Sequence, residues 1–321
     1  MPEKAIPNPK WGGGKDLSLL NAVGIAWIVF LGMGVFWYLV SGNPFFLFDL
    51  PYIGTSLALG GILSVVLPPR WAPYGRRVTQ LMVGLYILIY IGLTMKVSMQ
   101  IESFFFYTLA GAVGGATIHY IPSKLLGPII FNRGFCGWAC WTAMVLDFLP
   151  WKTPKTGRIK GAGVIRYLHF CLSFGLVFFL FFGLHYFPKS QSMAVLFWMA
   201  IGNALYYAAG ILLAYYTKDN RAFCKYLCPI PALQKILGRF ALFKVCIDRK
   251  KCTDCGICEK KCPMDIKLLD YARAGKRVLS TECILCAVCV TSCPQKAIGI
   301  SAGLDAGFRD SLRMKNGSLR Q

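Results

Sequence analysis

The sequence predicts an all-α membrane bundle of about six transmembrane helices, followed by a small α+β domain that is rich in cysteine. Two observations lead to this fold class. Of the 321 residues, 56% are hydrophobic and 15% are charged, and the mean hydropathy is +0.53, whereas soluble domains are about 25% charged. The 14 cysteines fall mostly into tight, regular groups. This composition excludes a disordered chain, a collagenous chain and an ordinary cytosolic enzyme.

Six apolar runs have lengths near the roughly 17–25 residues that a helix needs to cross a bilayer. They are Leu19–Ser41, Pro51–Leu67, Val78–Met95, Ser103–Ile121, Ile165–Phe187 and Met193–Tyr216. The second run is the shortest and the fourth is the least apolar. The first run is too long for the apolar core of a cleavable signal peptide, and no small-residue cleavage site follows it. We therefore expect it to remain as a membrane helix.

Basic residues gather in alternate loops: before the first run and after the second, fourth and sixth. They are Lys4, Lys10, Lys15, Arg70, Arg76, Arg77, Lys124, Arg133, Lys152, Lys155, Arg158, Lys160, Lys218, Arg221 and Lys225. The opposite loops contain only Lys96 and Lys189. Because cytoplasmic loops carry the excess of Lys and Arg, this pattern predicts a multi-pass protein of a bacterial inner membrane with both termini in the cytoplasm. It accounts for most of the net charge of +21 without a nucleic-acid partner.

The interiors of the runs contain almost no ionisable side chains, which argues against an ion pump or a coupled transporter. His119 and His169 lie near the predicted cytoplasmic ends of their runs, and His185 lies near the opposite surface. His119 and His169 are candidates for contacts with a quinone. A haem b between them is a less favoured alternative, and an ordinary interfacial role is the default for histidines at helix ends.

Two cysteine runs near the C-terminal end share the spacing Cys-x2-Cys-x2-Cys-x3-Cys-Pro. This is the pattern of bacterial ferredoxins with two [4Fe–4S] clusters, in which the fourth cysteine of each run ligates the other cluster. It assigns one cluster to Cys252, Cys255, Cys258 and Cys293, and the second to Cys283, Cys286, Cys289 and Cys262. A zinc module or a disulfide framework is less favoured, because zinc sites rarely need this spacing twice and disulfides are rare in cytoplasmic domains. The flanking segments Val245–Asp248 and Ala297–Ser301 are expected to form short strands.

A second repeat, Asn-Arg-x-Phe-Cys-x-aromatic-x-Cys, occupies Asn132–Cys140 and recurs at Asn220–Cys228. Both copies are expected at the cytoplasmic membrane face. Their four thiols could hold a third centre, either an iron–sulfur cluster or a soft metal such as copper(I) or zinc. These thiols are Cys136, Cys140, Cys224 and Cys228. A redox-active thiol pair and simple packing are the alternatives, and Cys171 and Cys246 are expected to be structural.

These features divide the chain into four parts. Residues 1–18 form a cytoplasmic N-terminal segment, and residues 19–235 form the membrane domain with the two Cys-x3-Cys elements. Residues 236–303 form the ferredoxin domain of bacterial two-cluster type, and residues 304–321 form a flexible tail. No glycine-rich nucleotide fingerprint occurs in a strand–turn–helix context, so flavin or pyridine-nucleotide chemistry is not expected in this chain.

Together, the motifs resemble the polyferredoxin-type membrane proteins. This group includes the ferredoxin-type quinol dehydrogenase of periplasmic nitrate reduction, the nitrous-oxide reductase regulator and the oxidase-assembly ferredoxin. Cys224, Cys228 and Pro229 match the family's Cys-x3-Cys-Pro element fully, whereas Trp141 follows Cys140 where the family usually has proline. The resemblance covers roughly the fourth run to residue 300 and implies electron exchange between the quinone pool and a redox partner.

We therefore expect a membrane-anchored electron-transfer protein, which could serve as a quinol dehydrogenase subunit. It would relay electrons between the quinone pool and a partner complex through two [4Fe–4S] clusters and a third centre at the membrane face. Its expected partners are membrane lipid, quinone or quinol, and other redox subunits, with no nucleic acid. A metal-handling or maturation factor, which reduces or delivers copper or iron for a respiratory oxidase or reductase, is the alternative. A redox sensor is a third hypothesis, but no effector or DNA-binding segment supports it.

Overall fold

The structure is a computed structural model that describes residues 17–68, 70–151, 157–188 and 191–305. Most of the predicted N-terminal segment and of the C-terminal tail lies outside these residues, as do Lys4, Lys10, Lys15, Lys152, Lys155 and Lys189. Within the described residues, five helical stretches are long and apolar enough to cross a membrane. They are Val23–Ser41, Phe45–Val66, Ala72–Thr94, Ala162–Gly183 and Met193–Thr217. The chain is therefore a multi-pass membrane protein.

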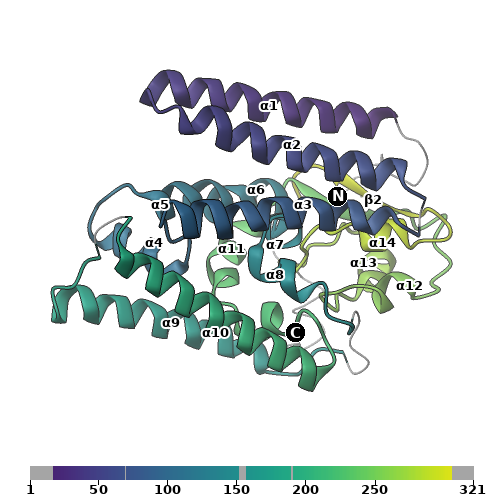
Figure 1. The fold of residues 1–321 in the computed structure, drawn as a ribbon. Coiled ribbons are helices and arrows are strands. Elements are labelled where there is room, and N and C mark those ends of the chain that lie inside the picture. Colours follow the sequence, from purple (N-terminus) through teal and green to yellow (C-terminus); the bar gives the residue numbers. More distant parts are fainter. Residues whose placement is uncertain (1–16, 69, 152–156, 189–190, 306–321) are drawn as a thin grey trace.

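Helices α1 (Leu17–Ser41) and α2 (Phe45–Val66) lie side by side along one edge of the molecule (Figure 1). Helix α2 also packs against α3 (Ala72–Leu85), which continues as the π-helical segment η1 (Tyr86–Thr94). Glycine makes the close approach of α2 and α3 possible, because a Cβ atom at Gly75 would lie 2.5 Å from the backbone oxygen of Gly60.

The fourth predicted run, Ser103–Ile121, is not one helix. It is divided between α4 (Ile101–Leu109) and α5 (Gly115–Tyr120). The intervening segment is glycine-rich, and Gly111 adopts a positive φ of 62°, which favours glycine and ends a helix. Phe104 stacks on Tyr120 with ring centroids 4.9 Å apart, so α4 folds back against α5. The prediction of a sixth long helix is therefore not confirmed for this segment.

The chain continues from α5 through the π-helical η2 (Ile121–Leu126) into α6 (Gly127–Phe131). Short helices then form the centre of the molecule: α7 (Gly134–Trp138), α8 (Trp141–Leu146), η3 (Ala162–Val164), η5 (Phe223–Leu227) and α11 (Ile230–Gly238). The last two membrane helices are α9 (Ile165–Phe178), extended by η4 (Phe179–Gly183), and α10 (Met193–Thr217). Phe105 of α4 packs edge-on against Phe170 and Phe174 of α9.

The C-terminal domain lies at one end of the molecule (Figure 1). Its strands β1 (Phe243–Ile247) and β2 (Ile298–Ala302) pair antiparallel, with Ile247 opposite Ile298, close to the expected strand positions. Three short helices complete it: α12 (Ile257–Lys260), α13 (Leu268–Arg273) and α14 (Val288–Thr291). A single buried core contains both apolar side chains and the cysteine sulfurs.

Candidate functional site

Four cysteines from both runs of the C-terminal domain line one cavity: Cys252, Cys255, Cys258 and Cys293. The chain folds around this cavity because Gly256 adopts a positive φ of 73°, which starts α12 directly after Cys255. The paired ends of β1 and β2 complete the wall with Ile247 and Ile298. This is the donor set that the sequence assigns to one [4Fe–4S] cluster, and four cysteine sulfurs from two loops suit that group.

The other four cysteines, Cys262, Cys283, Cys286 and Cys289, pack in the core of the same domain. The loop that carries Cys283, Cys286 and Cys289 turns in the same way as the loop of the first cavity, since Ala287 has a φ of 57° at the position equivalent to Gly256. Burial raises the pKa of the Cys262 thiol to about 12 and that of the Cys283 thiol also to about 12. Without a metal these thiols stay protonated at neutral pH, and metal binding is what deprotonates such ligands.

The first Cys-x3-Cys element, Asn132–Cys140, holds the second cysteine loop. The backbone N–H of Arg133 donates to the backbone oxygen of Cys283 (3.3 Å), and the indole N–H of Trp138 donates to that of Leu285 (3.0 Å). Both acceptors are main-chain oxygens, and they lie on either side of Ile284. The two bonds therefore fix the loop against the membrane domain.

The residue after the first cysteine differs between the elements, and each contacts the C-terminal domain in its own way. Gly137 leaves room for the backbone of Ile284, since a Cβ atom there would lie 2.2 Å from the Ile284 oxygen. Lys225 is fully buried and forms ion pairs of 2.6 Å with both Asp219 and Asp265. Both elements therefore lie directly against the cysteine-rich domain.

All four cysteines of the two elements line a second cavity: Cys136, Cys140, Cys224 and Cys228. Polar and aromatic side chains from the membrane helices complete the lining: Gln100, Tyr120, Lys124, Trp141, Asn203 and Tyr206. The structure thus brings together the four thiols that the repeat suggested. Trp141, the departure from the family pattern, donates its indole N–H to Asn203 (2.8 Å) and so joins α8 to α10.

The two elements also exchange hydrogen bonds. Arg133 donates to the backbone oxygen of Cys224 (3.3 Å), and Arg221 donates to the backbone oxygen of Cys136 (3.0 Å). Arg133 and Arg221 occupy equivalent positions, three residues before the first cysteine of each element. The repeat is therefore a structural pseudo-symmetry, in which each arginine fixes the turn that carries the other element's cysteine.

Carboxylates hold the arginines in place. Asp147 accepts two hydrogen bonds from Arg221 (2.7 and 2.6 Å) and forms an ion pair with Arg76 (2.9 Å). Burial alone would raise the pKa of Asp147, but the two guanidinium groups lower it below its ordinary value. Asp147 therefore remains ionised and bidentate, which fixes the orientation of Arg221.

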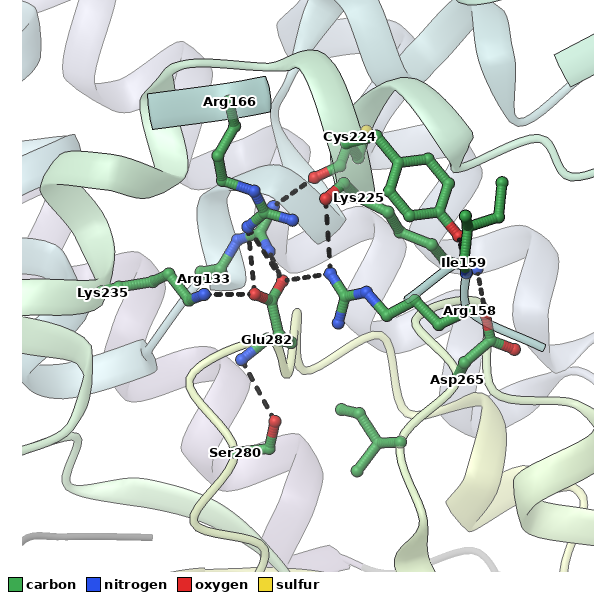
Figure 2. A network of polar contacts seen from close by, with 12 residues as sticks. Arg133, Arg158, Ile159, Arg166, Cys224, Lys225, Lys235, Asp265, Ser280 and Glu282 are labelled. Carbon is green, nitrogen blue, oxygen red and sulfur yellow. Dashed lines mark hydrogen bonds and ion pairs between the residues drawn. The ribbon is translucent and has the colours of Figure 1, made fainter. Parts of the chain in front are cut away.

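Glu282 lies at the junction of the two domains (Figure 2). It is buried directly before Cys283 and forms ion pairs with four basic side chains: Arg133 (2.5 Å), Arg158 (3.2 Å), Arg166 (3.0 Å) and Lys235 (2.5 Å). Burial alone would raise the pKa of Glu282, but these four cations lower it well below the ordinary value. One carboxylate of the cysteine-rich domain thus inserts into a basic pocket of the membrane domain.

Lys124 is a buried cation in the wall of the second cavity. It is 3% exposed, and its ammonium lies 2.7 Å from the ring centroid of Phe135. Within the described part of the chain it has no carboxylate partner at ion-pair distance. A buried unpaired cation is costly, so this cavity favours a negatively charged occupant.

Among the described residues, no three or more His, Cys, Asp or Glu side chains are grouped so that they could hold a single metal ion. Four cysteine sulfurs are the ligands of an iron–sulfur cluster, and they also suit a soft metal such as copper(I) or zinc.

The two histidines contact residues of the second cavity instead of each other. The His119 ring lies against Phe135 and Trp141, and His169 packs on Tyr206. Nδ1 of His169 lies 2.8 Å from the backbone oxygen of Leu227, the residue before Cys228.

Sequence reasoning missed four acidic residues. The sequence does not predict the roles of Glu282 and Asp147. The available signal for Glu282 was its position directly before Cys283, and the signal for Asp147 was the repeated arginine, which needs a carboxylate partner when it is buried.

Glu102 and Asp49 lie just outside the predicted runs that begin at Ser103 and Pro51. Glu102 accepts a hydrogen bond from Ser173 of α9 (2.9 Å), and Asp49 of α2 accepts one from Tyr86 of η1 (2.8 Å), so acidic side chains do lie among the helices.

Two family models match the regions that contain the cysteine groups. The model described as 4Fe-4S dicluster domain matches residues 244–298, which include both cysteine runs. The model described as 4Fe-4S binding domain matches residues 125–158 and 193–247, which include both Cys-x3-Cys elements. The two matches lie next to each other and cover every cysteine group described above.

The chain is similar to ferredoxin-type proteins. The chain is 29% identical over 211 residues to the ferredoxin-type protein NapH of Haemophilus influenzae, a match that covers 60% of this chain and 68% of the relative. It is 25% identical over 222 residues to the methylamine utilization ferredoxin-type protein MauN of Paracoccus denitrificans, covering 64% and 72%. A stretch of 80 residues is 40% identical to an uncharacterized protein of Methanocaldococcus jannaschii, 25% of this chain and 30% of that protein's length. No solved structure matches. The chain belongs to the polyferredoxin-type membrane proteins and is an iron–sulfur protein of electron transport.

Proposed function

We propose that the chain relays electrons between the quinone pool and a redox partner, using three iron–sulfur centres. Cys252, Cys255, Cys258 and Cys293 would hold the first [4Fe–4S] cluster, and Cys262, Cys283, Cys286 and Cys289 the second. Cys136, Cys140, Cys224 and Cys228 would hold the third. Such clusters, when bound, accept and release single electrons.

The observation that carries the third centre is the shared cavity of the four membrane-face thiols. Its charge supports a cluster, because Lys124 has no carboxylate partner in the described residues, and thiolates of an iron–sulfur centre would supply the missing negative charge. The match of a 4Fe-4S binding domain to both elements supports the same assignment. Copper handling is the alternative, because four thiols also suit copper(I), but the family model that matches both elements is a 4Fe-4S model.

We infer an order for the three cysteine groups from their contacts. Arg133 and Trp138 of the first element donate hydrogen bonds to the backbone oxygens of Cys283 and Leu285, so the membrane-face group adjoins the second cysteine loop. Cys255 of the first loop is exposed. The second group would therefore be the inner one and the first group the outer one.

In this proposal the quinone binds beside the second cavity, at His119 and His169. The His119 ring touches Trp141, and the His169 ring touches Tyr206, and both aromatic residues line the cavity.

The cytoplasmic orientation of the C-terminal domain is part of the proposal as well. Arg158 and Lys225, from two predicted cytoplasmic loops, form ion pairs with Glu282 and Asp265 of the C-terminal domain. Arg76, from a third such loop, donates a hydrogen bond to the backbone oxygen of Gly137.

Metal analysis of the full chain, purified without oxygen, tests the third centre. Three cubanes require about twelve irons per chain, with no stoichiometric copper. A variant with serine at Cys136, Cys140, Cys224 and Cys228 should retain about eight, because hydroxyl oxygen is a poor ligand for this centre. Cys171→Ser, at an exposed cysteine of α9, is the matched control and should retain all the iron. About eight irons in the unmodified protein, or copper in proportion to the chain, would contradict the proposal.

A further inference from the structure

The two cysteine loops of the C-terminal domain share a fold but differ in polarity. Between its cysteines the first loop carries Asp254, Glu259, Lys260 and Lys261, whereas the second carries no charged residue. The second loop is apolar because it is covered: Ile284 is 2% exposed and Leu285 is 7% exposed, against the membrane domain. The charged first loop is therefore the face of the cluster domain that stays open to solution.

Exposed lysines flank the cysteines of the first cavity in the sequence. We call them the basic rim: Lys250, Lys251, Lys260, Lys261 and Lys296, each within three residues of a cysteine of that cavity. Cys255 lies among them and is exposed. Helix α12, which carries Cys258 and ends at Lys260, lies at the edge of the molecule (Figure 1).

The nearby acidic groups balance only part of this charge. Asp248 pairs with Lys251 of the rim (3.7 Å), and Asp254 is held between Arg249 (2.5 Å) and Arg273 (3.6 Å). Glu259 accepts a hydrogen bond from the backbone N–H of Leu269 (2.9 Å). Because opposite charges steer a charged partner toward such a surface, the rim attracts an anionic macromolecule.

We propose that the basic rim docks an acidic redox protein, whose negatively charged surface surrounds its own redox group. This inference rests on the proposed relay, because it takes the first cysteine group as the point where electrons enter or leave. It adds the place of contact and the charge of the partner. Complementary charge around an exposed centre brings two redox groups close together without a large interface, as suits a transient complex.

Binding of a small acidic bacterial ferredoxin to the full chain in phosphatidylcholine nanodiscs tests this surface. Binding should weaken at least tenfold when the ionic strength rises from about 20 to about 200 mM, since exposed charges are screened over that range. The variant Lys250→Glu/Lys260→Glu should weaken it about tenfold or more at low salt. The same variant should bind a basic c-type cytochrome more tightly than the unmodified chain does.

Arg70→Glu/Lys160→Glu makes the same change of charge at exposed residues of the membrane domain and is the matched control. It should change both affinities less than the rim variant does at low salt, and leave them within about twofold at an ionic strength of about 100 mM, where charges are screened beyond about 10 Å. Binding without electron flow is measured, so failure of the relay and failure of docking give different results. Equal loss in both variants, or no salt-dependent binding at all, would overturn the proposal.

Discussion

Arg221 donates a hydrogen bond to the backbone oxygen of Cys136 across 3.0 Å, from one Cys-x3-Cys element to the other. Arg133 makes the equivalent bond to Cys224 in the opposite direction. The two elements therefore hold each other through the same groups. A guanidinium has five donors in a rigid plane, so each arginine can make this bond while it also binds a carboxylate. This reciprocity explains why the repeat includes arginine as well as the cysteines.

Replacing Arg221 should separate the two elements. Arg221→Met leaves Asp147 with Arg76 as its remaining cation and removes the bond to Cys136. Breaking a buried ion pair by removing one partner costs about 3–5 kcal/mol. We expect a lower unfolding temperature and loss of the iron assigned to the third centre. The double variant Arg221→Met/Asp147→Leu should be less stable still, because it also leaves the buried Arg76 without its carboxylate partner. Equal stability of both variants would contradict this account.

Removing the charge of Glu282 should loosen the junction between the domains. Glu282→Gln leaves four clustered cations without a counter-charge, at a cost of about 3–5 kcal/mol. Amide hydrogen exchange of residues 280–286 should become faster, because that loop is held by the membrane domain. Asp270→Asn is the control, since Asp270 is partly exposed on α13 and pairs only weakly with Arg273 (3.9 Å). Unchanged exchange in Glu282→Gln would show that backbone contacts alone hold the loop.

The contact of Gly137 with Ile284 makes another prediction about the same junction. In Gly137→Ala the new Cβ atom would meet the backbone oxygen of Ile284 at 2.2 Å, so one backbone must move. Overpacking of this kind costs about 1–3 kcal/mol. Faster exchange in residues 280–286 and a lower unfolding temperature are the expected results. Gly163→Ala is the matched control, because nothing lies within 4 Å of a Cβ atom there. Equal effects of the two changes would mean that the tight contact has no special role.

The fold and the cysteine groups could be predicted from the sequence to different degrees. The spacing of Cys252 and its partners identified the ferredoxin domain, because few metal sites need that pattern. The broken helix around Gly111 was missed, because apolar length alone does not reveal where a glycine-rich segment reverses the chain. The role of Glu282 was also hidden, since its four partners come from segments far apart in the sequence. Pairwise burial of charge depends on tertiary contacts that composition and periodicity do not encode.

The unpaired ammonium of Lys124 gives the sharpest test of what fills the second cavity. If the cavity holds a cluster with thiolate ligands, Lys124 stabilises its negative charge, and more so after reduction. Lys124→Met should then shift the midpoint potential of the third centre to a more negative value and lower its iron occupancy. In the protein stripped of iron the same change should raise the unfolding temperature, because it removes a buried cation that has no carboxylate partner in the described residues. Lys218→Met is the control, since Lys218 is exposed and rests on the rings of Trp151 and Tyr215. A potential that does not change, together with lower stability in the stripped protein, would mean that Lys124 serves the fold through Phe135 and not the centre.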